Sequence, residues 1–239
     1  MEPHRLRNNL LSSQPLCFNL FVPLALDLNL ATRLISALPS LGHIKRVTEV
    51  KLEYSPSPKS DYLNDGSSFD AWVEYERTDG SLGFIGIETK LTEPFSKAQY
   101  PFDQRYAKWM ACDGWWWKPG ADADFSNLSF NQLWRNHLLA FALRHKSPRK
   151  YAECYCAVCS HPLDAGCPRS VAAYAAHLLP AGSKALLSWP LDSLLNTWRP
   201  LATSRAERFW LQTIRLRYLD LEASEPAWHQ RTDREQAVP

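Results

Sequence analysis

The sequence predicts an α/β protein with a mixed central sheet of four to five strands flanked by helices. Three strand-like segments form a meander over residues 44–90, and helix-like and strand-like segments then alternate to about residue 221. The 239 residues, 45% of them hydrophobic, suit one domain with a sizeable core. We therefore expect a single domain over residues 1–221 and a polar tail over residues 222–239 that has little to bury.

The first half of the chain supplies a helix and a strand. Residues 24–38 carry apolar side chains three and four positions apart, which is typical of an amphipathic helix. Pro23 lies near its start and Pro39 just past its end. Residues 44–54 then alternate apolar and polar side chains, which predicts a half-buried strand.

Residues 69–77 and 82–90 are two further strands, and Asp79-Gly80 between them is a strong hairpin signal. A two-residue loop would pair Asp70 with Thr89. A three-residue loop would instead bring Asp70 opposite Glu88 or Lys90. If these three charged side chains work together, the loop must be odd-numbered or Asp70 must lie in a bend.

The second half continues the alternation. Residues 126–146 show helical spacing with Pro148 just beyond, and the same reasoning is compatible with a helix over 100–112. Strands are expected at 151–160 and 185–189, and further helices at 168–179, 190–197 and 204–221.

The strand at 82–90 ends in Glu88-Thr-Lys90. Residues two apart share a strand face, so Glu88 and Lys90 project together, away from Ile85, Ile87 and Thr89. One explanation is a surface ion pair of little energetic value. With Asp70 close by, a second explanation is a metal-dependent hydrolytic site. Two neighbouring carboxylates repel, a divalent cation relieves the repulsion, and a lysine can orient water or neutralise developing charge.

This arrangement resembles the PD-(D/E)xK nuclease superfamily, the restriction-endonuclease-like fold. Asp70 matches the family's Asp and Glu88-Thr-Lys90 its (D/E)xK, although Phe69 stands where the family often has Pro. The likeness spans roughly residues 44–220 and includes Glu53-Tyr-Ser-Pro56, Ser68-Phe-Asp-Ala71, Gly86-Ile-Glu-Thr-Lys-Leu-Thr-Glu93, Gln132-Leu-Trp-Arg-Asn136 and Arg217-Tyr-Leu-Asp220.

The resemblance implies DNA cleavage with Mg²⁺, or Mn²⁺ in its place. It implies that Asp70 and Glu88 bind the metal and that Lys90 assists the nucleophile, while the carbonyl of Thr89 offers a further oxygen ligand. Glu53 is an additional acidic candidate because it lies on the polar face of its strand.

Several further polar residues are candidates for substrate contact. Gln132 and Arg135 lie one helical turn apart, from where they could reach the scissile phosphate or brace the carboxylates. A net charge of +2 is too small to indicate nucleic-acid binding by itself, so a basic footprint must be local. The local run contains Arg144, Lys146, Arg149 and Lys150, which suit phosphate contacts or, alternatively, a solvated loop.

Two alternatives stay open. One is a catalytically inactive relative that binds nucleic acid or protein. The other is a zinc module built on Cys154, Cys156, Cys159, His161 and Cys167. We favour buried thiols, because the spacing is irregular and Cys159 lies on the opposite strand face from Cys154 and Cys156. Trp115–Trp117 could stack on bases, but a core or rim position is favoured.

The sequence also bears on location and partners. The longest strictly apolar run near the start, Phe21–Leu26, is too short for a membrane span, and no cleavage pattern follows it. We expect a cytoplasmic protein without a membrane segment. The chain has no room for a separate sequence-reading domain, so specificity must come from loops, from a homodimer or from a partner protein such as another defence-system component.

Overall fold

A computed structural model describes residues 12–96, 100–125, 129–147 and 149–220. The predicted polar tail, 222–239, lies outside the described residues, as does the last residue of the final predicted helix.

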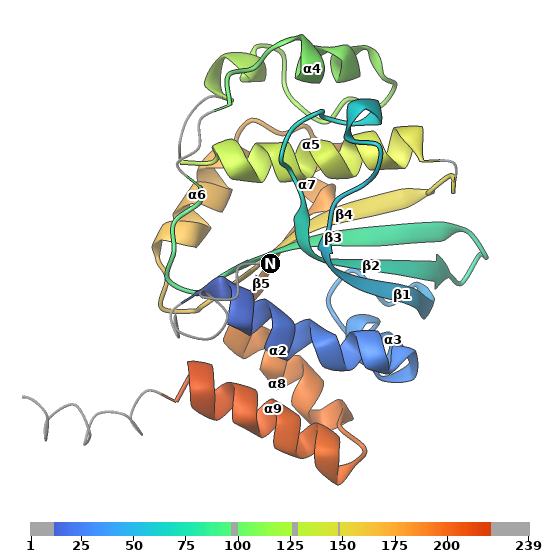
Figure 1. The fold of residues 1–239 in the computed structure, drawn as a ribbon, viewed down its shortest axis with the longest axis vertical. Coiled ribbons are helices and arrows are strands. Elements are labelled where there is room, and N and C mark those ends of the chain that lie inside the picture. The colour runs from blue at the N-terminus through green and yellow to red at the C-terminus, as the bar shows by residue number, and fades with distance from the viewer. Residues whose placement is uncertain (1–11, 97–99, 126–128, 148, 221–239) are drawn as a thin grey trace, which may run out of the picture.

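One five-stranded sheet organises these residues, with its strands in sequence order (Figure 1). The first three strands are antiparallel, and the third, fourth and fifth are parallel. The predicted α/β class and mixed sheet are therefore confirmed. The strands are β1 (Ile44–Tyr54), β2 (Phe69–Arg77), β3 (Leu82–Lys90), β4 (Glu153–Ser160) and β5 (Leu186–Pro190).

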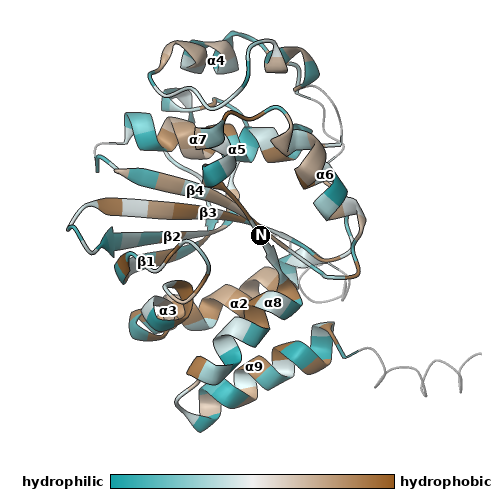
Figure 2. Cartoon of the chain, turned by 180° about the vertical axis from the view of Figure 1, so that it is seen from behind, coloured by the Kyte–Doolittle hydropathy of each residue, from teal (hydrophilic) through white to brown (hydrophobic). Residues whose placement is uncertain are grey.

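Helices cover both faces of the sheet (Figures 1 and 2). One face packs against α2 (Ser13–Leu26), α3 (Leu28–Ile35), α8 (Leu191–Trp198) and α9 (Arg205–Tyr218). The other packs against α5 (Asn131–Lys146), α6 (Gly166–Ala175) and α7 (Pro180–Ala185), with α4 (Gln104–Ala107) beyond α5. Short 3₁₀ turns occur at Lys59–Asp61, Lys108–Ala111, Ala121–Asp124 and Arg199–Leu201.

The central strand β3 separates two apolar cores. Ile85 and Ile87 pack into the core under α2 and α3, while Phe84 packs into the core under α5. The predicted alternation along this strand is confirmed. As a result, the last polar residues of β3 on the Phe84 face lie under the beginning of α5.

The N-terminal helical region differs from the prediction. In place of one helix over 24–38, α2 begins at Ser13, and the chain bends by 115° into α3. Asp27 stands at the break with an extended backbone, and its carboxylate caps α3 by accepting hydrogen bonds from the backbone N–H groups of Asn29 and Leu30, both at 2.9 Å. The earlier start brings Ser13 and Gln14 to the end of the sheet where Asp70 and Glu88 lie.

Among the described residues, no individual helix has the length and apolar character needed to span a membrane. The bent α2–α3 pair meets that criterion only when its two helices are counted together.

The β2–β3 hairpin has an odd-numbered loop. Glu76 pairs with Leu82, and the backbone N–H of Arg77 donates to the Ser81 carbonyl at 2.8 Å, which leaves three loop residues, 78–80. Gly80 supplies the left-handed conformation at φ 82°. Of the two loop lengths that the sequence left open, the structure has the three-residue one, and it sets Ala71 opposite Ile87.

A close approach at Gly86 yields a stability prediction. A Cβ atom at this position would lie 2.6 Å from Cζ of the fully buried Phe69 ring. We expect Gly86→Ala to lower the free energy of unfolding by about 1–3 kcal/mol, because the added methyl group forces the Phe69 ring and its neighbours in the core to shift. Urea unfolding measures the effect. Gly42→Ala is the matched control, since its Cβ would meet nothing within 4 Å. Equal stability of the two variants would contradict the packing argument.

Candidate active site

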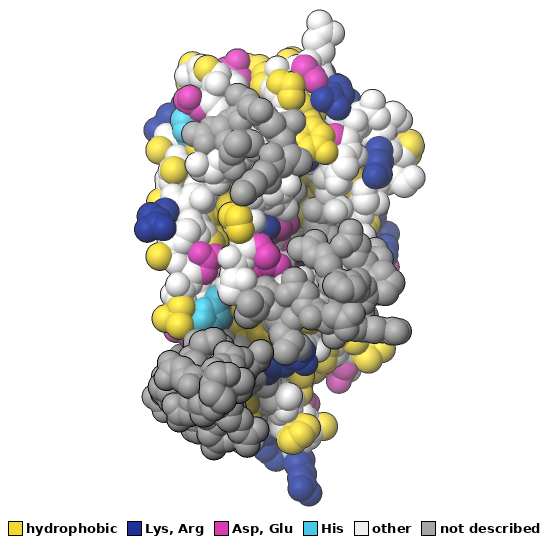
Figure 3. Space-filling model, turned by 60° about the vertical axis from the view of Figure 1, so that its left-hand side comes forward, with side chains coloured by type: hydrophobic (Ala, Val, Ile, Leu, Met, Phe, Trp, Pro, Cys, Tyr) yellow, Lys and Arg dark blue, Asp and Glu magenta, His cyan; other side chains and the backbone are white. Residues whose placement is uncertain are grey.

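A polar cavity of about 400 Å³ opens where β1 and β3 end and β2 begins. Figure 3 brings this side of the molecule forward and shows acidic side chains near the middle of the face. The cavity gathers residues from α2, three strands, the segment after β3 and the start of α5. They are Ser13, Gln14, Glu53, Asp70, Glu88, Lys90, Glu93, Pro94, Ser96 and Gln132.

Strand register aligns three of the carboxylates. Ala71 lies between Leu52 and Ile87 in the paired strands, so the next position outward sets Asp70 between Glu53 and Glu88. Opposed residues of antiparallel strands are close neighbours. Pairing therefore places the three residues side by side across the strands, while Asp70 accepts from the hydroxyl of Thr89, on the strand face opposite Glu88.

Glu53 departs from regular strand geometry. Its φ of 52° lies in the left-handed region, which a non-glycine residue adopts only when its surroundings impose it. The alternation of strand faces is interrupted here. Tyr54 and Lys51 are three residues apart, which would set them on opposite faces of a regular strand, yet both lie against the ring of Trp72. Glu53 thus faces the cavity through a backbone distortion, and its Oε1 accepts from Gln14 Nε2 at 3.3 Å.

Glu88 is held rigidly. Gln132 Nε2 donates to its Oε1 at 2.7 Å, and Asn136 Nδ2 donates to its Oε2 at 2.8 Å. The Lys90 ammonium lies 2.8 Å from the same Oε1, and the two side chains are only 7% and 4% exposed. A solvated surface ion pair is therefore excluded as the explanation of this sequence pair.

Asp70 is fixed by its neighbour across the hairpin. The backbone N–H and the hydroxyl of Thr89 donate to its Oδ2 at 2.7 and 2.8 Å. Burial and the nearby Glu88 carboxylate raise the pKa of Asp70 to about 7, against the opposing effects of Thr89 and Lys90. The cavity thus carries more negative charge than its own residues balance.

Lys90 stays a cation. Burial acts to lower its pKa, but the Glu88 carboxylate outweighs burial, so that the pKa is raised above its usual value. The ammonium also donates to Gln132 Oε1 at 3.1 Å. Among the described lining residues, Lys90 is the one cation facing four carboxylates.

Sequence reasoning missed part of this lining. Glu93 accepts from the backbone N–H and hydroxyl of Ser13 at 2.6 and 3.1 Å, which ties α2 to the end of β3. Burial raises the pKa of Glu93, but backbone hydrogen bonds from Ser13 and the 91–93 segment outweigh it and keep the pKa low. The Ser12 N-cap before Pro15 was the available signal for this helix start, and Asn136 follows Gln132 by one turn.

The five basic residues predicted to contact nucleic acid lie in two separate places. Arg135 is buried in an ion pair with Asp65, 3.2 Å away, beside the cavity. Arg149 pairs with the buried carboxylate of Glu74 at 2.6 Å and is half exposed. Arg144 is partly buried, while Lys146 and Lys150 are exposed. Arg144 and Lys146 lie in the last turn of α5, roughly 18–21 Å from Gln132 at 1.5 Å per helical residue, and Arg149 and Lys150 follow the helix.

The cysteines and tryptophans are structural in the described part of the chain. Cys154 and Cys156 are buried in the core under α5, whereas Cys159 is buried on the opposite face, so these three thiols do not meet. Trp116 and Trp117 are buried and Trp115 is partly buried, which confirms the predicted core or rim position.

The cavity fits a divalent cation. Its candidate ligands are all oxygens, and Gln14 Oε1 is a buried acceptor with no hydrogen-bond donor. Within the described residues no group of three or more His, Cys, Asp and Glu side chains is arranged to hold a metal. Mg²⁺ needs only one or two carboxylates beside water and phosphate oxygens, so Asp70 and Glu88 suffice.

A mixed sheet that gathers Asp70, Glu88 and Lys90 in one polar cavity defines the class as an α/β protein with a hydrolase-like site. A model of the PD-(D/E)XK nuclease superfamily matches residues 1–220, and the chain belongs to that superfamily. Its sheet is the restriction-endonuclease-like one that the sequence predicts. No curated protein and no solved structure matches the chain.

The raised pKa of Asp70 predicts a pH-dependent stability. The folded protein holds the proton up to about pH 7, whereas the unfolded chain releases it near pH 4. Between these values the unfolded state binds fewer protons, so the free energy of unfolding falls as pH rises. Without divalent cation, we expect Asp70→Asn to exceed the native protein in stability at pH 8, by on the order of 2 kcal/mol, and to approach it at about pH 4.

Urea unfolding at both pH values measures this difference. Asp79→Asn serves as a control of opposite sign, because hydrogen bonds from Ser81 lower the pKa of that exposed carboxyl. If the difference in free energy of unfolding between Asp70→Asn and the native protein does not change with pH, burial of the Asp70 charge is not its cause.

Proposed function

We propose that the protein is a metal-dependent nuclease that hydrolyses phosphodiester bonds in DNA. The observation that carries this proposal is the convergence of Asp70, Glu88 and Lys90 in one cavity, with the ammonium 2.8 Å from Glu88. Membership of a nuclease superfamily supports the reaction class. DNA as the substrate and Mg²⁺ or Mn²⁺ as the cofactor are parts of the proposal.

Asp70 and Glu88 would hold the cation. When bound, a divalent cation acidifies water and offsets the charge of the phosphodiester. Thr89 keeps the Asp70 carboxylate in place through two hydrogen bonds, and Gln132 and Asn136 do the same for Glu88. Gln132 is thus a positioning residue, since it acts through Glu88 and Lys90.

Lys90 supplies the positive charge of the protein itself. Because its raised pKa keeps it protonated, it stabilises negative charge that develops on the phosphate oxygens and orients the attacking water. Its buried, hydrogen-bonded position fixes the ammonium before substrate arrives, so little reorganisation is needed during the reaction.

A cleavage assay tests the proposal. We expect plasmid cleavage with Mg²⁺ or Mn²⁺, and a loss of about 10²-fold or more in Asp70→Ala and in Lys90→Ala, because each removes charge at the reacting phosphate. Asp103→Ala, which alters a partly exposed carboxylate paired with Arg105, is the matched control. Cleavage that persists in both variants would refute the assignment of the active site. Binding without cleavage by the native protein would favour an inactive relative.

The basic end of α5 predicts a dependence on substrate length. Arg144 and Lys146, in the last turn of α5, lie roughly 18–21 Å from Gln132, or about five to six nucleotides at 3.4 Å each, and Lys150 follows the helix. Changing all three to Gln should weaken binding of a duplex of about 20 base pairs by about tenfold or more, and leave a single strand of about four nucleotides unaffected. Fluorescence anisotropy measures both affinities. Equal weakening of the two probes would contradict this placement.

A further inference from the structure

A second polar cavity lies beside the catalytic one. Its volume is about 190 Å³, and Ser96 and Gln132 line both cavities. The reaction proposed above makes no use of it. Its lining consists of hydroxyls, amides, one aromatic ring and one guanidinium, from Gly66, Ser67, Ser68, Ser96, Tyr100, Gln132, Arg135 and Asn136.

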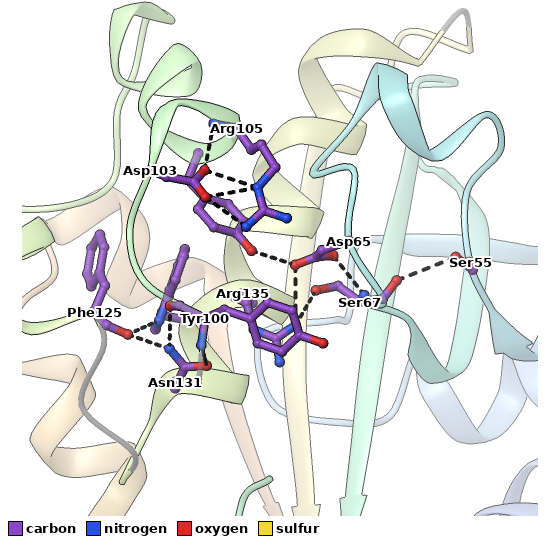
Figure 4. Close-up of polar contacts among 11 residues, drawn as sticks. Ser55, Asp65, Ser67, Tyr100, Asp103, Arg105, Phe125, Asn131 and Arg135 are labelled. Carbon is purple, nitrogen blue, oxygen red and sulfur yellow. Dashed lines mark hydrogen bonds and ion pairs between the residues drawn. The ribbon is translucent and has the colours of Figure 1, made fainter. Parts of the chain in front are cut away.

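Arg135 is the charged group of this cavity, and it is only 5% exposed. Its Nη1 donates to Asp65 Oδ2 at 3.2 Å and to Ser67 Oγ at 2.9 Å (Figure 4). Its Cζ lies 3.9 Å from the centroid of the Tyr100 ring, so the guanidinium plane is fixed by stacking.

One edge of this guanidinium has unused donors. The Nε–H is buried without an acceptor, and Arg135 makes hydrogen bonds to other described residues only through Nη1. A buried donor without a partner costs free energy, so native proteins rarely retain one without a reason. The hydroxyl of Ser68, half-buried in the same cavity, likewise has no side-chain hydrogen bond to a described residue.

Asp65 orients the arginine. Its carboxylate accepts from the Ser67 backbone N–H at 2.8 Å and from the Tyr106 hydroxyl at 2.9 Å, in addition to Arg135. It therefore remains attached to the loop before β2 whether or not a ligand is bound. The ion pair offsets the cost of burying the guanidinium in the free protein. Because it uses only Nη1, the edge that carries Nε–H is not occupied by Asp65.

We propose that this cavity binds a phosphate of the DNA strand next to the scissile phosphodiester, through Arg135 and Ser68. The inference rests on the proposed function and adds a position for the neighbouring nucleotide. An arginine edge with parallel N–H donors matches a phosphate in geometry and charge. The shared Gln132 wall places the cavity directly beside Glu88, so a strand held at the carboxylates continues into it.

A binding experiment in EDTA tests this subsite without cleavage. The double variant Asp65→Asn/Arg135→Gln exchanges a neutral ion pair for a neutral hydrogen-bonding pair, so the fold is expected to persist. We expect about tenfold weaker binding of a labelled single strand on the order of ten nucleotides, measured by fluorescence anisotropy. An abasic strand of equal length should show the same loss, because it keeps the phosphates.

The matched control is Asp103→Asn/Arg105→Gln, which makes the same exchange at a partly exposed ion pair that makes no hydrogen bond to Asp65 or Arg135 (Figure 4). Its affinity should stay that of the native protein. Unchanged affinity of a folded Asp65→Asn/Arg135→Gln variant would overturn the subsite. So would a loss confined to the strand with bases, since the cavity would then hold a base.

If the double variant does not fold, Ser68→Ala replaces it. We expect about three- to tenfold weaker binding, and unchanged affinity would again overturn the subsite. Cleavage is scored separately. A native protein that binds but never cleaves refutes the proposed function and leaves the subsite intact. Cleavage with unaffected variant affinities refutes the subsite alone.

Discussion

The buried ion pair between Glu88 and Lys90 is the constraint on which the site depends. Removing two charges from water is costly, and their attraction offsets that cost only when further hydrogen bonds complete the arrangement. Gln132 and Asn136 provide those hydrogen bonds, which requires the first turns of α5 to lie across the end of β3. Apolar residues of similar volume would stabilise the fold at least as well, so the buried pair is better explained by chemistry than by stability.

The sheet and α5 contribute different side chains to this site. The strands bring the carboxylates together, and burial, together with the Glu88 carboxylate, raises the pKa of Asp70. The beginning of α5 supplies the donors that position Glu88 and, through Arg135, reach into the neighbouring cavity. A cation at the strands and a phosphate at the helix would meet on either side of Gln132. In the proposed reaction, Gln132 would thus couple substrate positioning to metal binding.

The apolar scaffold makes this geometry possible. Cores on both faces of β3 hold the strand in place, and Gly86 lets the Phe69 ring pass directly against it. The three-residue hairpin loop then fixes which residues of β2 and β3 are opposed. Because a one-residue slip would turn every side chain to the other face, the loop length decides whether Asp70 can act with Glu88.

The sequence by itself determined the mixed sheet, the hairpin and the Asp70, Glu88 and Lys90 set, and it required an odd hairpin loop only if these three residues act together. These follow from strand alternation and turn chemistry, which are properties of neighbouring residues. Only the tertiary structure decided the break at Asp27, the turned backbone of Glu53, and the contributions of Gln14, Glu93 and Asn136 to the site. It also decided that Arg135 pairs with Asp65, while the other basic residues lie in the last turn of α5 or just after it. The physical reason is that contacts between segments tens of residues apart depend on how the helices pack on the sheet. The local periodicity of a sequence does not determine that packing.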